Sequence, residues 1–419
     1  MNPPRTAPLP STADVARARC RVAPLSRALG ASLVLATALA TSACGGSSAA
    51  PPTVTPKTSS TTTPTLRAQI APTDDDAGGT SSEVFARAGD DMTTGKLAPA
   101  RVLYDRVVAA ERASLPAGAA TSELGRAAAY NAGLCSEQLG DSKDARDRFR
   151  ELASASPDTP EAIDANMRRG RLDVEVEDYD DLALAAASLL ARKDVAVGDR
   201  VEGLALQAIA LVASKDATGA EKDVLEGQKV VDAADDAHPL SPRNLAAFYF
   251  AKGELLRARG EAIELNPPGA DFGTKLETRC QRLLDAEDAY VASIGTQEVD
   301  WAVRDGVRVA YLYTSLHDDL MTIQPPKQAN TDARKALFRG AMHLRYRILL
   351  QKGLGTLEHT LNLEERTDVK TGWLQRARDA KATLDKELAD EKAEIAKLPY
   401  SEAELQKALD DLSKPKSSP

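Results

Sequence analysis

The side chains of this chain that could hold a metal or move a proton are scarce. No two of its four histidines stand four residues apart, the spacing that aims two ligands at one metal from a helix. These histidines are His238, His317, His343 and His359. No phosphate-cradling glycine loop and no H-E-x-x-H, G-x-S-x-G or C-x-x-C motif occurs. The sequence therefore predicts no catalytic residue, no metal site and no cofactor, and a chain that is not an enzyme.

Two short stretches gather the densest groups of reactive side chains. One is Leu316-His317-Asp318-Asp319-Leu320, and the other contains Asp232, Asp235, Asp236 and His238. Each stretch could supply a general base or metal ligands. Each is also typical of a polar helix face or helix end, and we favour that structural interpretation for both.

The four cysteines divide between the two parts of the chain. Cys20 and Cys44 lie in or beside an N-terminal apolar segment, which leaves Cys135 and Cys280 in the body of the protein. An oxidising compartment would permit a disulfide between these two. Because they lie far apart in the sequence, we favour packing of each as a small apolar side chain in a helical core.

The N-terminal segment has the features of an export signal. Four arginines (Arg17, Arg19, Arg21 and Arg27) precede an apolar run from Ala28 to Ala40. As a helix this run would measure roughly 20 Å, which is short of the ~30 Å hydrocarbon core of a bilayer. A basic region, a short apolar region and small residues before a cut describe a signal peptide. We assign residues 1–43 to it.

The end of the signal, Leu39-Ala40-Thr41-Ser42-Ala43-Cys44-Gly45, resembles the lipobox of bacterial lipoproteins. The resemblance implies cleavage before Cys44 and a lipid on its sulfur, and Gly45 after the cysteine implies the outer membrane. The alternative is a cut after Ala38-Leu39-Ala40, which would leave a soluble periplasmic protein. Either way we expect the protein in the cell envelope, and cleavage before Cys44 would attach it to the membrane through the lipid.

The composition distinguishes a tether from a helical body. Residues 44–81 are rich in Ser, Thr and Pro and predict a disordered linker, and residues 414–419 predict a disordered tail. In the whole chain aromatic residues are only 4%, which favours closely packed helices over sheets. The formal charge of −9 argues against binding to nucleic acid, which needs clusters of Lys and Arg.

A repeated pattern of small and aromatic residues begins near residue 82. In AAAYNAGLCSEQLGDSKDARDRFRELASASPDTP, residues 127–160, the pattern places Gly133 and Ala145 at close helix contacts and Gly140 in the turn. Phe149 fills the space beside them, and Pro157 ends the second helix. This stretch resembles a tetratricopeptide repeat (TPR). The same offsets recur upstream at Ala88, Gly95, Ala100 and Tyr104.

The resemblance implies an all-α solenoid of helical hairpins over residues 82–295. Later copies of the repeat are weaker: we expect hairpins from helices at 163–176 and 179–191 and at 201–214 and 219–233, and a fifth begun at 245–259 with Gly253 at its close contact. An irregular helical bundle is the alternative. A C-terminal helical block, residues 296–413, follows as a cap or as a separate interaction surface. Its second helix, near 331–366, contains Gly353 and Gly355, which could interrupt it.

The resemblance also implies a partner groove lined by the first helix of each hairpin. Repeat position assigns to it Tyr130, Leu134 and Glu137 from the second hairpin and Phe250, Glu254 and Arg257 from the fifth. Ordinary packing between hairpins is the alternative for these residues.

We interpret the chain as a membrane-anchored TPR adaptor or scaffold that binds other proteins in a bacterial envelope assembly. Outer-membrane biogenesis, secretion or pilus assembly, and motility are the systems that the resemblance implies. The alternative is a surface-exposed or periplasmic lipoprotein that binds glycans or nutrients. The low aromatic content argues against it, because sugar sites stack pyranose rings on exposed aromatic side chains.

Overall fold

The computed structural model describes residues 80–116, 119–234, 239–327, 329–367 and 371–413. The predicted signal peptide, Cys44, nearly all of the tether and the tail at 414–419 lie outside these residues. In the part described, the regular secondary structure is α-helical. The helices are α2 (Thr80–Thr93), α3 (Leu97–Ser114), α4 (Glu123–Gln138), α5 (Ser142–Ala155), α6 (Pro160–Val176), α7 (Tyr179–Ala191), α8 (Val197–Ala213), α9 (Ala217–Ala233), α10 (Pro242–Glu261), α11 (Phe272–Ile294), α12 (Val299–Met321), α13 (Asp332–Thr367), α14 (Gly372–Ala396) and α15 (Glu402–Ser413).

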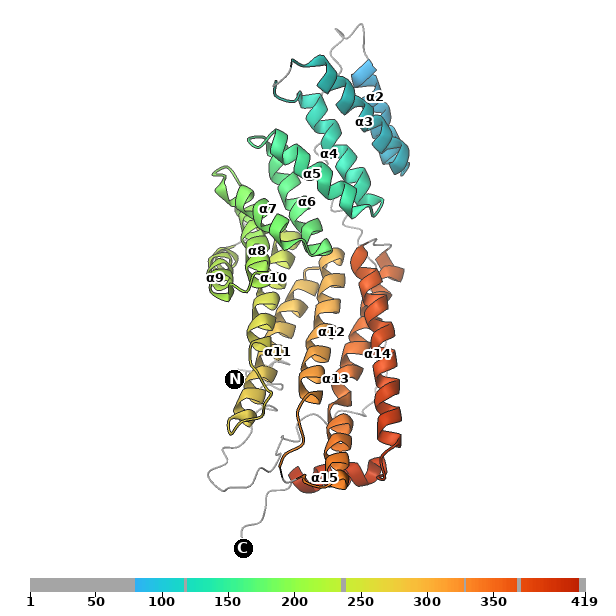
Figure 1. The fold of residues 1–419 in the computed structure, drawn as a ribbon. Coiled ribbons are helices and arrows are strands. Elements are labelled where there is room, and N and C mark those ends of the chain that lie inside the picture. Colours follow the sequence, from blue (N-terminus) through green and yellow to red (C-terminus); the bar gives the residue numbers. More distant parts are fainter. Residues whose placement is uncertain (1–79, 117–118, 235–238, 328, 368–370, 414–419) are drawn as a thin grey trace, which may run out of the picture.

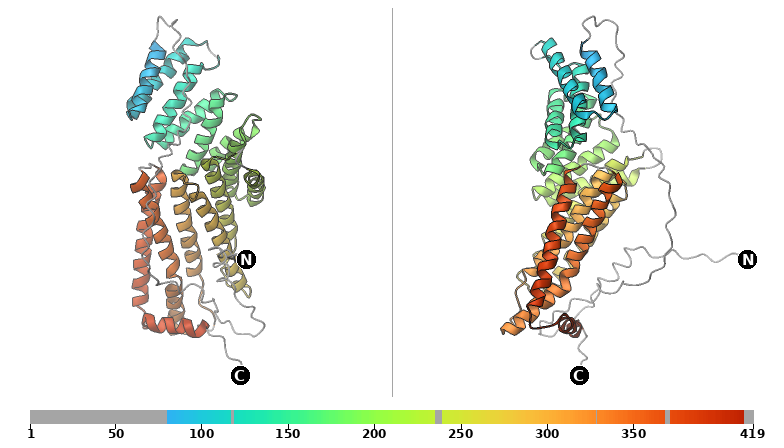
Figure 2. Two further views of the ribbon diagram at one scale, coloured as in Figure 1. Left: turned by 180° about the vertical axis from the view of Figure 1, so that it is seen from behind. Right: turned by 90° about the vertical axis from the view of Figure 1, so that its right-hand side faces the viewer.

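Consecutive helices pair into hairpins that stack along the molecule. The first to fifth hairpins are α2–α3, α4–α5, α6–α7, α8–α9 and α10–α11, and α12–α13 is the sixth (Figure 1). α14 lies along α13, and α15 crosses the far end of this C-terminal block (Figure 2). The prediction of an all-α stack of helical hairpins is confirmed. None of the helices described is both long and apolar enough to cross a membrane.

The corners inside the second, third and fourth hairpins share one local design. A residue in the left-handed region precedes an aspartate whose carboxylate accepts a hydrogen bond from the backbone N–H three residues on. The pairs are Gly140–Asp141, Glu177–Asp178 and Lys215–Asp216, with φ of 78°, 59° and 65° at their first residues. The predicted turn at Gly140 is therefore one of three similar turns, and Glu177 and Lys215 take the left-handed position in the other two.

The small residues of the repeat pattern lie where two helices approach closely. A Cβ added at Gly133 would come within 2.7 Å of the Phe149 ring, and one at Gly253 within 2.5 Å of the Tyr290 ring. The other apolar repeat positions, Ala88, Ala100, Tyr104 and Ala145, are buried. Pro157 follows the end of α5, and Gly95 takes a left-handed φ of 77° after α2. Larger side chains at the close contacts would push the helices of each hairpin apart.

The largest apolar cluster joins the later hairpins to the C-terminal block. It runs from Val174 at the end of α6 to Trp373 at the start of α14. Trp301 of α12 lies against Phe250 of α10, with ring centroids 5.1 Å apart. Two smaller clusters hold the first and second hairpins. The C-terminal block therefore shares its core with the hairpins before it.

The helix α13 is unbroken, although two glycines could have interrupted it. A Cβ at Gly353 would lie 3.3 Å from the carbonyl oxygen of Ala310, so this glycine lets α12 approach α13. Gly355 faces open space. Packing of α13 against α12 and α14 stabilises the helix through the two glycines.

Candidate interaction surface

The residues that the sequence assigned to the groove in the second hairpin contact the third hairpin. Tyr130 donates a hydrogen bond from its hydroxyl to Asp164 of α6, and its side chain is 2% exposed. Arg168 of α6 donates to Glu137 at 2.7 Å and to Asp164 at 2.9 Å. Burial raises the pKa of the Tyr130 phenol well above its usual value, so the hydroxyl stays a donor. Leu134 is buried in the same cluster.

The groove residues of the fifth hairpin contact α11 and α12 of the same chain. Phe250 is 0% exposed and packs against Tyr290 and Trp301. Glu254 accepts a hydrogen bond from the Tyr290 hydroxyl at 2.6 Å. Burial by itself would raise the pKa of Glu254, but the charges of Arg308 and Arg257 outweigh it and bring the pKa down to about 2.

This arrangement corrects the prediction of exposed anchors. Tyr130, Leu134, Phe250 and Glu254 are buried because the next helices along the chain cover them, so they do not form an open surface. Arg257 remains partly accessible, and its guanidinium lies 5.8 Å from the ring centroid of Tyr311, whose side chain is 46% exposed. Position in the repeat did not reveal that α6 would lie over this face of α4 and α12 over that of α10.

A chain of ion pairs continues along this inner face from hairpin to hairpin. Arg171 of α6 donates to Glu202 of α8 at 2.6 Å, and Asn244 of α10 donates to the other oxygen of Glu202 at 3.1 Å. Arg308 of α12 lies 3.1 Å from Glu254 of α10. We call this set the inner network; its charged members are Glu137, Asp164, Arg168, Arg171, Glu175, Glu202, Glu254, Arg304 and Arg308. Because these charged side chains are largely withdrawn from water, removing either member of a pair would leave the other without compensation and would destabilise the fold.

The inner network also joins the third hairpin to the start of α14. Glu175, near the end of α6, accepts a hydrogen bond from the Gly372 backbone N–H at 3.0 Å and one from the Thr371 hydroxyl at 3.3 Å. Its carboxylate thus caps a helix that begins almost 200 residues later. Arg304 of α12 donates to the Arg171 carbonyl at 3.1 Å and lies 3.8 Å from Glu175.

Trp373 completes this junction. The guanidinium groups of Arg308 and Arg376 lie 5.2 Å and 4.6 Å from its ring centroid. Arg376 also donates to Glu177 at 2.8 Å, at the corner of the third hairpin. The Arg308 side chain is 14% exposed, and a cation–π contact that is shielded from water in this way is stronger than an exposed one. The third and sixth hairpins are therefore held together directly, across two intervening hairpins.

His317, in the stretch 316–320 of α12, is buried in the C-terminal block and belongs to an ion-paired cluster with residues of α13 and α14. Nε2 of His317 lies 2.7 Å from Glu391 of α14, and Nδ1 of His343 of α13 lies 3.0 Å from the same oxygen. Burial alone would lower the pKa of His317, but its contacts with Asp318 and Glu391 raise that pKa to about 9. The imidazolium at neutral pH holds three helices together, as the structural interpretation of this stretch requires.

Sequence reasoning missed Glu391 as the partner of His317, and His343 as the second histidine on the same carboxylate oxygen. A signal for Glu391 is present, because the apolar positions Leu374, Ala377, Leu384, Leu388 and Ile395 follow a spacing of three and four along α14 and Glu391 occupies the same stripe. A carboxylate at a core position of a heptad requires a buried partner.

Three carboxylates, Asp173, Asp178 and Asp181, come within 4.8 Å of one another at the corner of the third hairpin. Guanidinium groups surround them: Arg150 and Arg169 both donate to Asp181, and Arg146 donates to Asp178 at 2.9 Å. Asp173 is fully buried, and the desolvation, followed by the charge of Asp181, raises its pKa to about 8. Each of the three carboxylates therefore has an arginine guanidinium beside it.

The two cysteines of the body lie in different clusters. Cys135 is buried among the small side chains of the first two hairpins, where desolvation raises its thiol pKa to about 11. Cys280 is half-buried on α11 against the large cluster. Their environments fit the packing role that we favoured for both.

Comparisons with known proteins give only distant likeness. The chain matches no protein-family model and no curated protein. Among solved structures, a tetratricopeptide repeat protein from Parabacteroides merdae ATCC 43184 is similar with a TM-score of 0.40 and 13% identity, over 73% of this chain and 98% of that one. The TPR domain of P58(IPK) is similar with a TM-score of 0.22 and 12% identity, over 74% and 99%. The assignment of this chain to the helical-repeat class rests on its own hairpin packing.

Proposed function

We propose that this protein is a lipid-anchored scaffold of helical repeats that binds other proteins in a bacterial envelope assembly. One observation supports this most: the inner network joins successive hairpins from α4 to α12, and its residue Glu175 caps α14. A stack fixed in this way presents surfaces whose relative positions do not change, and stacked helical repeats serve chiefly to present such extended binding surfaces.

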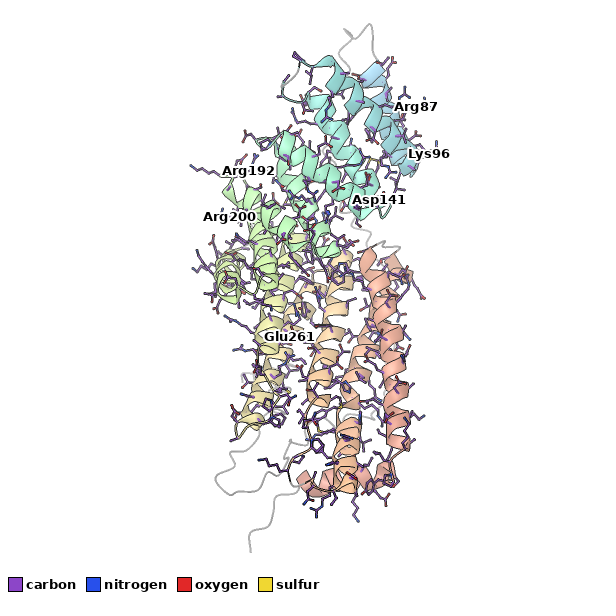
Figure 3. The ribbon with its side chains drawn as sticks, viewed as in Figure 1. Arg87, Lys96, Asp141, Arg192, Arg200 and Glu261 are labelled. Carbon is purple, nitrogen blue, oxygen red and sulfur yellow. The ribbon has the colours of Figure 1, made fainter. Side chains whose placement is uncertain are left out.

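The accessible surface for partners lies outside the inner face. Charged side chains such as Arg87, Lys96 and Arg200 are exposed and project from the stack (Figure 3). Large apolar side chains are exposed between them on several hairpins, including Val102, Leu184, Leu225 and Tyr311. Arg257, from the predicted groove, remains partly accessible beside the exposed Tyr311. Tyr and Arg are common among the residues that contribute most of the binding energy at protein interfaces.

The envelope location is supported by the sequence of the N-terminal segment. A lipid on Cys44 and a linker of Ser, Thr and Pro to residue 81 would hold the helical body at a membrane while letting it reach partners. Outer-membrane biogenesis, secretion or pilus assembly, and motility remain the candidate systems.

The experiment that tests this proposal is an affinity purification from the envelope. The protein with a C-terminal tag is solubilised in mild detergent, and mass spectrometry identifies the mature N-terminus and the co-purifying proteins. A Cys44→Ala variant is the matched control for lipidation. We expect an acylated Cys44 and a reproducible set of envelope proteins. An unmodified N-terminus at Thr41 together with no partners would overturn the proposal, and melting shifts with oligosaccharides would then favour the glycan-binding alternative.

A further inference from the structure

A pocket of about 610 Å³ lies at the corner of the third hairpin, outside the inner network's core contacts. The end of α6 and the start of α7 form one wall, the last turn of α8 forms the other, and Arg146 of α5 closes one side. Its volume is in the range of sites that take a small molecule or a few side chains, about 300–1,000 Å³. We call it the corner pocket.

The corner pocket is acidic. Glu177, Asp178 and Asp180 line it against a single positive residue, Arg146. Glu177 and Asp178 already have arginine partners, whereas Asp180 is exposed and forms no ion pair with any residue that the structure describes. The last turn of α8 adds its carbonyl groups, which form the negative end of the helix dipole. The ligand that this lining favours carries positive charge.

The lining of the corner pocket also includes apolar side chains. Val176 of α6 is 39% exposed, and Ala183 of α7 and Ala210 and Leu211 of α8 line the pocket with it. A compact inorganic cation would gain nothing from these side chains. An aliphatic stem that ends in an ammonium or guanidinium group would contact both the apolar and the acidic side chains, because Lys and Arg side chains bury their stems and leave the charged head beside polar groups.

Asp173 lies behind the pocket lining and shows that the arginines at this corner are shared among several carboxylates. It is fully buried, and neither of its carboxylate oxygens has a hydrogen-bond partner among the residues described. Its nearest cations are the Nε atoms of Arg146 and Arg169, each 3.6 Å away. Arg146 is shared between Asp173 and Asp178, so a cation arriving at Asp178 and Asp180 would leave Arg146 to pair with Asp173.

We propose that the corner pocket binds a lysine or arginine side chain from a basic segment of the partner protein. This rests on the scaffold function proposed above and gives the partner a chemical character: a segment with positive charge, held by its aliphatic stem and its charged head. The acidic rim excludes an acidic C-terminal segment.

Peptide binding to the purified helical body tests this proposal. Fluorescein-labelled tetra-arginine and tetra-lysine are titrated by fluorescence anisotropy at 150 mM salt, with tetra-glutamate as the negative control and spermidine as an unlabelled competitor. Asp180→Asn removes the unpaired carboxylate, and Ala183→Phe fills the pocket without changing its charge. Asp288→Asn is the matched control, because Asp288 is an exposed aspartate on α11 with no ion pair to any described residue.

We expect the basic peptides to bind, tetra-glutamate not to bind, and both pocket variants to weaken binding at least fivefold. Asp288→Asn should leave the affinity within twofold of the unmodified protein, and all three variants should keep its melting temperature. Equal weakening by Asp288→Asn would overturn the proposal, since it would show attraction to an acidic surface in general. Spermidine that competes as well as an equally charged peptide would also overturn it, in favour of a free polyamine as the ligand.

The failure of this inference can be distinguished from the failure of the scaffold function. If Asp180→Asn and Ala183→Phe proteins still recover the same partners from the envelope, the scaffold function stands and the corner pocket is not its docking site. If both variants lose one partner whose basic segment competes with tetra-arginine, the pocket and the partner are assigned together.

Discussion

At the scale of single residues, burial decides what a groove residue does. Phe250 and Tyr311 are both aromatic and lie on adjacent first helices, yet one is fully buried and the other is nearly half exposed. Their substitutions should therefore act on different properties of the protein.

We expect Phe250→Ala to lower the free energy of unfolding by about 3–5 kcal/mol, because it opens a cavity beside Tyr290 and Trp301. Tyr311→Ala should change the free energy of unfolding by less than about 1 kcal/mol and should instead lower the amount of partner protein recovered in the affinity purification. Urea unfolding followed by circular dichroism measures the first effect. Equal stability of the two variants would show that α12 does not cover α10 in solution.

The His317 cluster predicts a loss of stability in alkaline solution. The unfolded chain has a histidine pKa near 6.5, and the folded protein has one near 9, so the folded form binds this proton more tightly. The stabilisation is complete below about pH 6.5 and is lost as the pH rises through 9. Unfolding experiments at pH 6 and pH 9.5 should show this decrease in the unmodified protein and a smaller one in His317→Gln. The same slope in both proteins would assign it to other groups.

At the scale of helices, local signals in the sequence predicted the helices of the hairpins, although the predicted starts of α6, α8 and α10 lie three to four residues too late. The predicted helix at 179–191 coincides with α7, and that expected at 245–259 lies within α10. Caps such as Asp141 and turns such as Gly140 act over a few residues, so their positions can be derived from spacing alone. The cover over Phe250 could not be derived in this way, because it depends on how α12 of the sixth hairpin packs on α10 of the fifth.

Two glycines with equal space for a Cβ should change the stability of the protein in opposite directions when each is replaced by alanine. Gly140 has a left-handed φ of 78°, and Gly355 lies inside α13; a Cβ at either site meets no atom within 4 Å. We expect Gly140→Ala to destabilise the protein by about 1–2 kcal/mol. Gly355→Ala should stabilise it by about 1 kcal/mol. Thermal unfolding of the two variants side by side measures both, and the same sign for the two would contradict the assigned backbone conformations.

At the scale of the whole molecule, the apolar core is uneven. One cluster joins α6 to α14, whereas the first two hairpins depend on two smaller clusters. The inner network connects these regions through Arg168, but an ion pair adds little without the packing around it.

We therefore expect the first two hairpins to open before the rest. In native-state hydrogen exchange with added denaturant, amides of α2–α5 should exchange at lower denaturant than those of α8, α10 and α12. A peptide in α11 serves as the internal reference, because α11 belongs to the large cluster. Simultaneous exchange of all helices would show that the stack opens as one unit.

The bond between Glu175 and the Gly372 N–H also sets a limit on when this protein can reach its final form. A ribosome releases α6 long before it adds residue 372, and the two groups are 197 positions apart. Until then the carboxylate of Glu175 lacks the helix end that it caps, although Arg304 has already been made. The junction between the third hairpin and α14 is therefore among the last contacts to form, after the hairpins that it joins have left the ribosome.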